Sequence, residues 1–204
     1  PVTSFIRALG LGTDAEILDY FGDDERMRAT IEKDAASNVE EGLIEVYKKL
    51  RPSEPPTVDS AQTHINNLFF DPNRYDMSRV GRYKYNKKLG IANRLEGQVL
   101  AEPIANPRTG EVMALRDEKI TKEKAFEIEN AGVKIAYVKA ADETIVKVIS
   151  NGMVDIACYV DFDAEAECDI REHVRFDVLC EILDSCENED DLKEMLRSRA
   201  DELV

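Results

Sequence analysis

A proline-rich corner in the first third of the chain sets the strongest limit on its fold. Pro52, Pro55 and Pro56 lie close together, and each fixes φ and removes a backbone donor, so no helix continues through them. Glu54, directly before the proline pair, is driven toward an extended conformation. Thr57 can then cap a new helix. The corner therefore predicts that one helix ends before it and another begins after it.

The segment after the corner carries apolar residues at helical spacing. They fall on one face of a helix and are Val58, Ala61, Ile65, Leu68 and Phe69. Asp71-Pro72-Asn73 then supplies turn chemistry that ends the helix. The sequence therefore predicts a short, capped helix followed by a turn.

A basic segment follows, over residues 74–88, and it holds the only concentrated positive charge in an acidic chain. Its one acid is Asp76, its tyrosines are Tyr75, Tyr83 and Tyr85, and its basic residues are Arg74, Arg79, Arg82, Lys84, Lys87 and Lys88. We expect a loop here. Basic side chains with interleaved tyrosines suit phosphate contacts. Two other readings stay open, a solvated surface loop or one that pairs with acids elsewhere in the protein.

These residues carry a resemblance to a known family. The stretches LRPSEPPT and NNLFFDPNRYDMSRVGRYKYNKKL resemble the second lobe of the bacterial DNA-directed RNA polymerase beta subunit. The family usually has Gly where this chain has Ser53, and Leu where it has Met77. Upstream, residues 1–10 and 14–18 resemble the segment of the same subunit that precedes the corner. The match is tight over about forty residues and keeps its order over about ninety.

The resemblance implies a role within a larger enzyme. In the family the lobe lines the main channel and lies over the downstream DNA, and the catalytic magnesium is held by the other large subunit. The resemblance thus implies that the chain has no catalytic, metal or cofactor site of its own. It implies beta-prime, alpha, omega and sigma as protein partners, DNA as a partner in the complete enzyme, and a cytoplasmic location. The six basic residues are then the candidate nucleic-acid contacts.

Residues 1–90 are expected to form a mostly helical lobe segment. Pro1 to Leu9 is a short apolar lead-in, and Thr13 with Glu16 forms a capping box for a helix that ends at Gly22. Further helices are predicted over residues 24–35 and 39–50 from their apolar spacing. The missing initiator Met at Pro1 suggests a piece of a longer protein.

Residues 91–204 are expected to form a lineage-specific, β-rich insertion with an acidic helical tail. A helix is predicted over residues 121–131, and Asn151-Gly152 is a strong hairpin signal. The stretch VLAEPIANPRTGEVMALRDEKITKEKAFEIENAGV resembles the sandwich-barrel insertions of large polymerase subunits. Two helices, 173–183 and 189–203, end the chain, and strands are predicted over 94–100, 111–115, 133–138, 144–150 and 153–160. The fold class is therefore α+β: a helical lobe segment, an inserted small β-rich sandwich-barrel-like unit and C-terminal helices.

Charge and residue spacing exclude several functions. The net charge of −15 argues against the whole chain wrapping nucleic acid. The four cysteines form no C-x-x-C pair, which disfavours a zinc site. The acidic run 161–169 lacks the glycine and the ligand spacing of a calcium loop, and we expect a solvated loop there. No membrane-spanning run or signal peptide is apparent.

Three classes of function remain. The leading one is a non-catalytic, channel-lining piece of a multisubunit nucleotidyltransferase. The alternative is an independent acidic protein-interaction module that docks transcription regulators. A self-contained hydrolase or metal enzyme is disfavoured, because His64 and His173 have no neighbouring nucleophile pattern.

Overall fold

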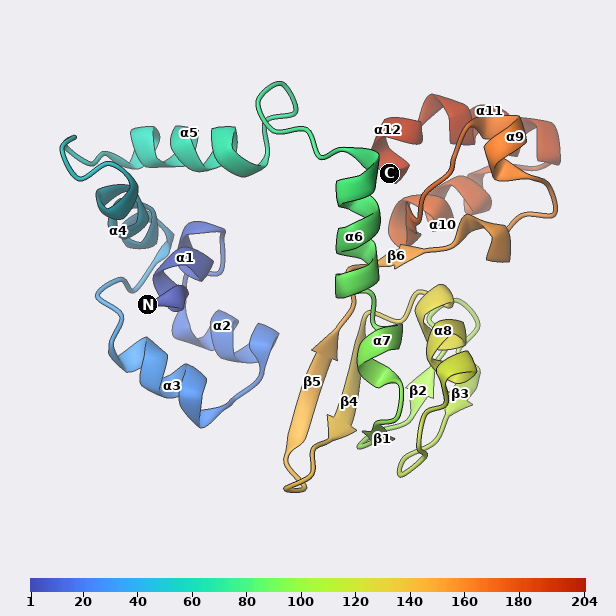
Figure 1. Cartoon of the computed structure of the whole chain (residues 1–204), viewed down its shortest axis with the longest axis horizontal. Coiled ribbons are helices and arrows are strands. Elements are labelled where there is room, and N and C mark those ends of the chain that lie inside the picture. Colours follow the sequence, from blue (N-terminus) through green and yellow to red (C-terminus); the bar gives the residue numbers. More distant parts are fainter. The chain divides into compact units, whose positions relative to one another are not determined.

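The chain divides into two compact units. A computed structural model describes residues 1–204, and the units are Pro1–Met77 and Ser78–Val204. Helices dominate the first unit, whereas small antiparallel sheets and further helices make up the second (Figure 1). The α+β class is confirmed. The sequence predicted a boundary at residue 90 between a lobe segment and an insertion. That boundary is one of family organisation rather than of compactness, and it stays a prediction.

The first unit consists of five helices. They are α1 (Val2–Ala8), α2 (Asp14–Phe21), α3 (Glu25–Glu32), α4 (Val39–Leu50) and α5 (Val58–Phe69). The predicted capping box is confirmed, since Glu16 N donates to Thr13 Oγ1 at 3.2 Å and Thr13 N donates to Glu16 Oε2 at 2.8 Å. The lead-in, in contrast, is itself a helix, because α1 packs along α4 and this packing compensates for its short length.

The proline corner separates α4 from α5 as predicted. Helix α4 ends at Leu50, and Thr57 caps α5 by accepting a hydrogen bond from Ser60 N at 3.2 Å. The apolar faces of the two helices meet α1 in one buried cluster, made of Ala8, Leu43, Tyr47, Ala61 and Ile65. The predicted apolar face of α5 therefore supplies Ala61 and Ile65 to the core.

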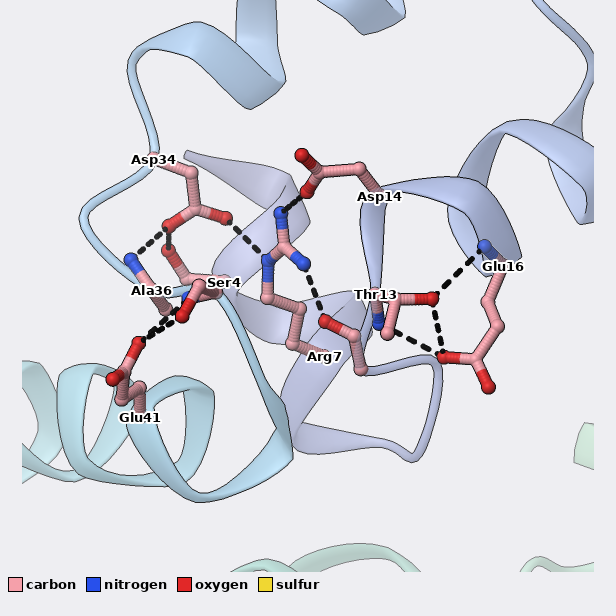
Figure 2. Close-up of polar contacts among 10 residues, drawn as sticks. Ser4, Arg7, Thr13, Asp14, Glu16, Asp34, Ala36 and Glu41 are labelled. Carbon is pink, nitrogen blue, oxygen red and sulfur yellow. Dashed lines mark hydrogen bonds and ion pairs between the residues drawn. The ribbon is translucent and has the colours of Figure 1, made fainter.

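A buried arginine joins the loops of the first unit (Figure 2). The Arg7 side chain is 1% exposed, and its Nε donates to Asp34 Oδ2 at 3.2 Å, while another nitrogen of the group pairs with Asp14. Asp34 also accepts from Ser4 Oγ at 2.6 Å and from Ala36 N at 3.0 Å. Burial raises the pKa of Asp34, but these hydrogen bonds outweigh it and lower the pKa to about 2. The network fixes the loop after α3 against α1.

Gly42 permits the close approach of α1 and α4. A Cβ at this position would lie 2.8 Å from Arg7 Cβ and 2.8 Å from Ser4 O. Only a residue without a side chain therefore allows the two helices to cross at this distance.

The second unit combines three small sheets with seven helices and one short 3₁₀ helix. Its helical segments are α6 (Arg79–Leu89), α7 (Ala92–Leu95), α8 (Lys122–Asn130), η1 (Ile156–Cys158), α9 (Ala164–Cys168), α10 (Phe176–Ser185), α11 (Glu189–Ser198) and α12 (Ala200–Leu203). Its strands are β1 (Val99–Leu100), β2 (Ile104–Ala105), β3 (Val112–Ala114), β4 (Ile135–Lys139), β5 (Ile145–Ile149), β6 (Met153–Val154) and β7 (Val174–Arg175).

All strand pairing in this unit is antiparallel. One sheet has the order β1-β4-β5, and two-stranded ribbons pair β2 with β3 and β6 with β7. In the larger sheet Tyr137 lies opposite Lys147. None of these sheets closes into a barrel, so the sandwich-barrel detail of the prediction is not what the structure shows.

Four local predictions for this unit were wrong. The strand predicted over 153–160 is limited to β6, and the 3₁₀ helix η1 follows it. The segment 94–100 is mainly the end of α7 and the short β1, not one strand. Asn151-Gly152 does not close a hairpin, because β5 pairs with β4 and β6 pairs with β7. The acidic run 161–169 contains helix α9, which Asp163 caps by accepting from Glu165 N at 3.0 Å and from Ala166 N at 3.1 Å.

Two apolar clusters stabilise the second unit. One lies among the larger sheet, α7 and α8, and includes Leu95, Leu100, Ile128 and Val138. The other joins β6 and β7 to the C-terminal helices, and includes Val154, Val174, Leu179, Leu196 and Leu203. None of the helices combines the length and the apolar character that crossing a bilayer requires.

Candidate nucleic-acid interface

Most of the basic segment is a helix rather than the predicted loop. Helix α6 begins after Ser78, whose Oγ accepts a hydrogen bond from Gly81 N at 3.3 Å. Lys87 and Lys88 lie in its last turn, where the negative end of the helix dipole stabilises cations. The helix buries none of its residues. Because it has no apolar stripe, the hydrophobic pattern that predicts helices was absent, and only the cap and the terminal charges signalled it.

The structure separates Arg74 from the other five predicted contacts. Arg74 belongs to the first unit, where its Nε lies 3.6 Å from Asp71 Oδ2 in the turn after α5. Arg79, Arg82, Lys84, Lys87 and Lys88 all lie on α6, in the second unit. The candidate interface is therefore a property of α6, and we describe it from this helix alone.

Two arginines of α6 converge on one carboxylate. Arg82 Nε lies 2.7 Å from Glu172 Oε2 and Arg82 Nη2 lies 3.2 Å from Glu172 Oε1, while Arg79 Nε lies 3.4 Å from the same Oε1. We call Arg79 and Arg82 the arginine fork. The Glu172 side chain is only 10% exposed. The hydrogen bond from Arg82 is the main cause that lowers the pKa of Glu172, so the carboxylate is charged.

The three lysines lie on the other side of the helix. At 100° per residue, Lys84, Lys87 and Lys88 fall within about 100° of arc, centred about 160° from the arginine fork. All three side chains are exposed and none makes an ion pair or a side-chain hydrogen bond. We call this set the lysine face. It is an unneutralised positive surface in a chain of net charge −15.

Two exposed tyrosines flank Lys84 in the sequence of α6. Tyr83 is 61% exposed and Tyr85 is 51% exposed. On the helix Tyr83 lies about 40° from Lys87. Aromatic rings beside cations suit stacking on bases or sugars that accompany a bound phosphate.

The C-terminal half of α6 is held by neighbouring segments of its own unit. Asn86 Oδ1 accepts from Asn151 Nδ2 at 3.1 Å, and the carbonyl of Lys87 accepts from Asn93 Nδ2 at 2.9 Å. Arg94 donates to the carbonyl of Leu89 at 2.6 Å. The bonds to Lys87 O and Leu89 O satisfy backbone carbonyls that the helix end leaves open. They also fix the direction in which the lysine face points within the unit.

A buried carboxylate supports the turn after α6. Glu129, 8% exposed, accepts from Ala92 N at 2.8 Å and so satisfies a backbone donor at the start of α7. A Cβ on Gly90 would lie 2.5 Å from Glu129 Oε2. Glycine at this position therefore allows the chain to turn tightly between α6 and α7.

Sequence reasoning missed Glu172. It lies 90 residues beyond Arg82, in a tail with nineteen acids between residues 142 and 204. Nothing local distinguishes it from the other acids. The alternative that the basic segment pairs with acids elsewhere in the protein is correct for the arginine fork, and it does not hold for the lysine face within this chain.

The structure places no metal-binding cluster near α6. No group of three or more His, Cys, Asp and Glu side chains is arranged to hold a metal ion. The four cysteines are free thiols, and burial raises the pKa of Cys158 and Cys168. What α6 offers is charge and hydrogen-bond donors, which suit binding of an anionic polymer.

Comparison with known proteins gives a consistent result. The family model described as RNA polymerase Rpb2, domain 2, matches residues 1–104. DNA-directed RNA polymerase subunit beta of Clostridioides difficile (strain 630) is 51% identical over all 204 residues, and that of Clostridium acetobutylicum is 50% identical. The subunit of Clostridium botulinum (strain Loch Maree / Type A3) is 52% identical over the same length.

The chain spans 16% of the length of each of these relatives. The similarity covers both compact units, whereas the family model covers the first unit and, in the second, α6, α7, β1 and the first residue of β2. The predicted resemblance is confirmed. The chain therefore belongs to the RNA polymerase Rpb2 domain 2 family and is similar throughout to the beta subunit of bacterial DNA-directed RNA polymerase.

Proposed function

We propose that this chain is a non-catalytic part of a polymerase beta subunit that lines the main channel and helps to hold downstream DNA. One observation carries the proposal: the lysine face of α6 is exposed and has no acidic partner, although the chain is strongly acidic. A local cationic surface of this kind attracts phosphate. The relatives, named as subunits of a DNA-directed RNA polymerase, make DNA the favoured polyanion.

The contacts are proposed to position the duplex without reading its sequence. Lysine ammonium groups act as point charges toward phosphate oxygens, and phosphate contacts carry no base information. The fixed end of α6, held through Asn86 and Lys87 O, keeps these charges in one orientation. Lys84, Lys87 and Lys88 are the main proposed contacts, and Arg74, which lies near Asp71, is a further one.

The rest of the machinery is proposed to lie on other chains. In this proposal the beta subunit assembles with beta-prime, alpha, omega and sigma in the cytoplasm, and nucleotide addition occurs at a magnesium site on the other large subunit. No metal or cofactor is assigned to the present chain. Its part in the reaction is electrostatic and mechanical.

The test uses the complete polymerase with Lys84, Lys87 and Lys88 changed to Ala. We expect a shorter open-complex lifetime and a weaker dependence of that lifetime on salt, because about 0.9 counterions are released for each neutralised phosphate. A matched control changes Lys33, Lys119 and Lys122 to Ala; these lysines are exposed and make no ion pair. Equal lifetimes in the two variants would contradict the proposal.

A further inference from the structure

The arginine fork has the geometry of an anion site that is already filled. Arg79 and Arg82 are three residues apart, so their side chains leave the same face of α6. Both guanidinium groups reach one carboxylate, at 3.4 Å from Arg79 and at 2.7 and 3.2 Å from Arg82. A guanidinium binds phosphate with the same two-pronged geometry that it uses for carboxylate.

Glu172 lies in a segment whose flanking residues are buried. Its neighbours two residues away on either side, Ile170 and Val174, are 4% and 0% exposed. The neighbouring Arg171 does not pair with Glu172: its Nε lies 3.1 Å from Glu165 Oε1 and its Nη2 lies 3.0 Å from Asp169 Oδ1. The carboxylate that meets α6 is therefore held in place by the packing of its own segment. A phosphate that approaches the fork must displace it.

We propose that Glu172 occupies a second phosphate site on α6, so that Arg79 and Arg82 bind a backbone phosphate of nucleic acid only when the Glu172 carboxylate is displaced. This inference rests on the proposed function, because the lysine face brings the duplex to the helix. Helix α6 then binds phosphate with two different affinities, depending on whether Glu172 occupies the arginine fork. The lysine face acts alone while Glu172 holds the fork, and the fork adds its two cations when Glu172 leaves.

The competing explanation is that Glu172 serves only to attach α6 to its unit. Under that explanation, removal of the carboxylate charge would loosen the helix and weaken any binding by the lysine face. Under our inference the same change strengthens binding, because Asn86, Lys87 O and Leu89 O still anchor the helix through other bonds. The two explanations therefore predict opposite signs for one substitution.

The first arm of the test compares Glu172→Gln with Glu187→Gln in the complete 204-residue chain. Both changes move the net charge from −15 to −14, and Glu187 is exposed and makes no ion pair or side-chain hydrogen bond. Binding to a fluorescent 20-base-pair duplex is followed by anisotropy across a salt series. We expect Glu172→Gln to bind severalfold more tightly than the control, with a salt slope steeper by about 1 to 2 because one or two further phosphates are neutralised.

The second arm is a double-mutant cycle. The double variant Arg79→Ala/Arg82→Ala, which removes two positive charges, is made in the parent chain and in the Glu172→Gln background. We expect the arginine changes to cost more affinity in the Glu172→Gln background, by the factor gained in the first arm, since only there do the arginines contact phosphate. Circular dichroism and the NMR signals of α6 check that every variant keeps the helix.

Three results would overturn the inference. They are equal binding by Glu172→Gln and Glu187→Gln, weaker binding by Glu172→Gln, or equal losses from the arginine changes in both backgrounds. The proposed function fails separately, if substitution of the lysine face leaves binding unchanged. If the lysine-face variants lose binding while Glu172→Gln binds like Glu187→Gln, the proposed function stands and the inference about Glu172 fails.

Discussion

Replacing Asp34 by Asn tests whether the buried ionic network organises the first unit. The change keeps the size of the side chain and removes its charge. The side chain of Asp34 is fully buried, and that of Arg7 beside it is 1% exposed. The substitution leaves the guanidinium with Asp14 as its remaining carboxylate partner. Breaking a buried pair costs about 3 to 5 kcal/mol, and because Asp14 remains we expect about 3 kcal/mol.

The pKa of Asp34 gives a second measure of the same interaction. Its pKa is about 2 in the folded chain against 3.8 ordinarily, and the difference, 3.8 − 2, at about 1.36 kcal/mol per pKa unit, corresponds to about 2.4 kcal/mol. A depressed carboxyl pKa contributes stability that is present above pH 3.8 and is lost as the pH falls toward 2. The two magnitudes agree to within about 1 kcal/mol.

The assay is urea unfolding followed through the NMR amide signals of α1 and α4, at several pH values between 7 and 2. We expect the free-energy gap between the parent chain and Asp34→Asn to be about 3 kcal/mol at pH 7 and to shrink by about 2 kcal/mol by pH 2. Asp23→Asn is the control. It disrupts a similar pair with Arg28 that is more than half exposed, and it should leave the unfolding midpoint almost unchanged.

A gap that stays constant from pH 7 to pH 2 would contradict an electrostatic role for Asp34. It would mean that Asp34 stabilises the unit by shape and hydrogen bonding alone, without a contribution from its charge. A large effect of Asp23→Asn would refute the distinction between buried and exposed pairs on which the argument depends.

The remaining predictions concern helix packing and the ionisation of a buried tyrosine. Gly42→Ala should destabilise the first unit by about 1 to 3 kcal/mol in thermal melts, because the added Cβ meets Arg7 Cβ and Ser4 O at 2.8 Å; unchanged melting would show that α1 and α4 separate easily. Burial raises the pKa of Tyr159 to about 12, so an ultraviolet titration should show a late tyrosine step that Tyr159→Phe removes. Because the neutral phenol is favoured in the fold, its stabilisation is present below pH 10 and is lost as the pH rises through about 12.

Local sequence signals predicted the helices of the first unit well. Helices α4 and α5 combine an apolar stripe with a cap at Asn38 or Thr57, and the prolines between them leave few alternatives. Several levels of information agree there, so the prediction is reliable. Helix α1 was missed because seven residues give too short a pattern, and its stability depends on packing against α4.

Strand pairing in the second unit could not be predicted from local signals. Gly152 does adopt a positive φ of 72°, so the turn chemistry at Asn151-Gly152 was interpreted correctly. The turn nevertheless passes the chain from the β4–β5 pair to the β6–β7 pair, and Phe176 N donates to Gly152 O at 2.9 Å. Which strand becomes a partner depends on tertiary contacts, and a dipeptide does not contain that information.

The candidate site was predicted in part for the same reason. Clustering in sequence found the five cations of α6, because helical neighbours in the chain are neighbours in space. It could not separate the arginine fork from the lysine face, since that separation depends on Glu172, 90 residues away. The charge of each cation was visible in the sequence, whereas its neutralisation was visible only in the fold.

The most direct test of the account measures duplex binding by this chain, using anisotropy across a salt series. Lys84, Lys87 and Lys88 changed to Ala are compared with the control set Lys33, Lys119 and Lys122 changed to Ala, and both variants have a net charge of −18, which is −15 − 3. We expect weak, salt-sensitive binding that the control keeps and the lysine-face variant loses, with a salt slope smaller by about 2 to 3. Equal binding by the two variants would contradict the claim that α6 presents the phosphate-binding surface.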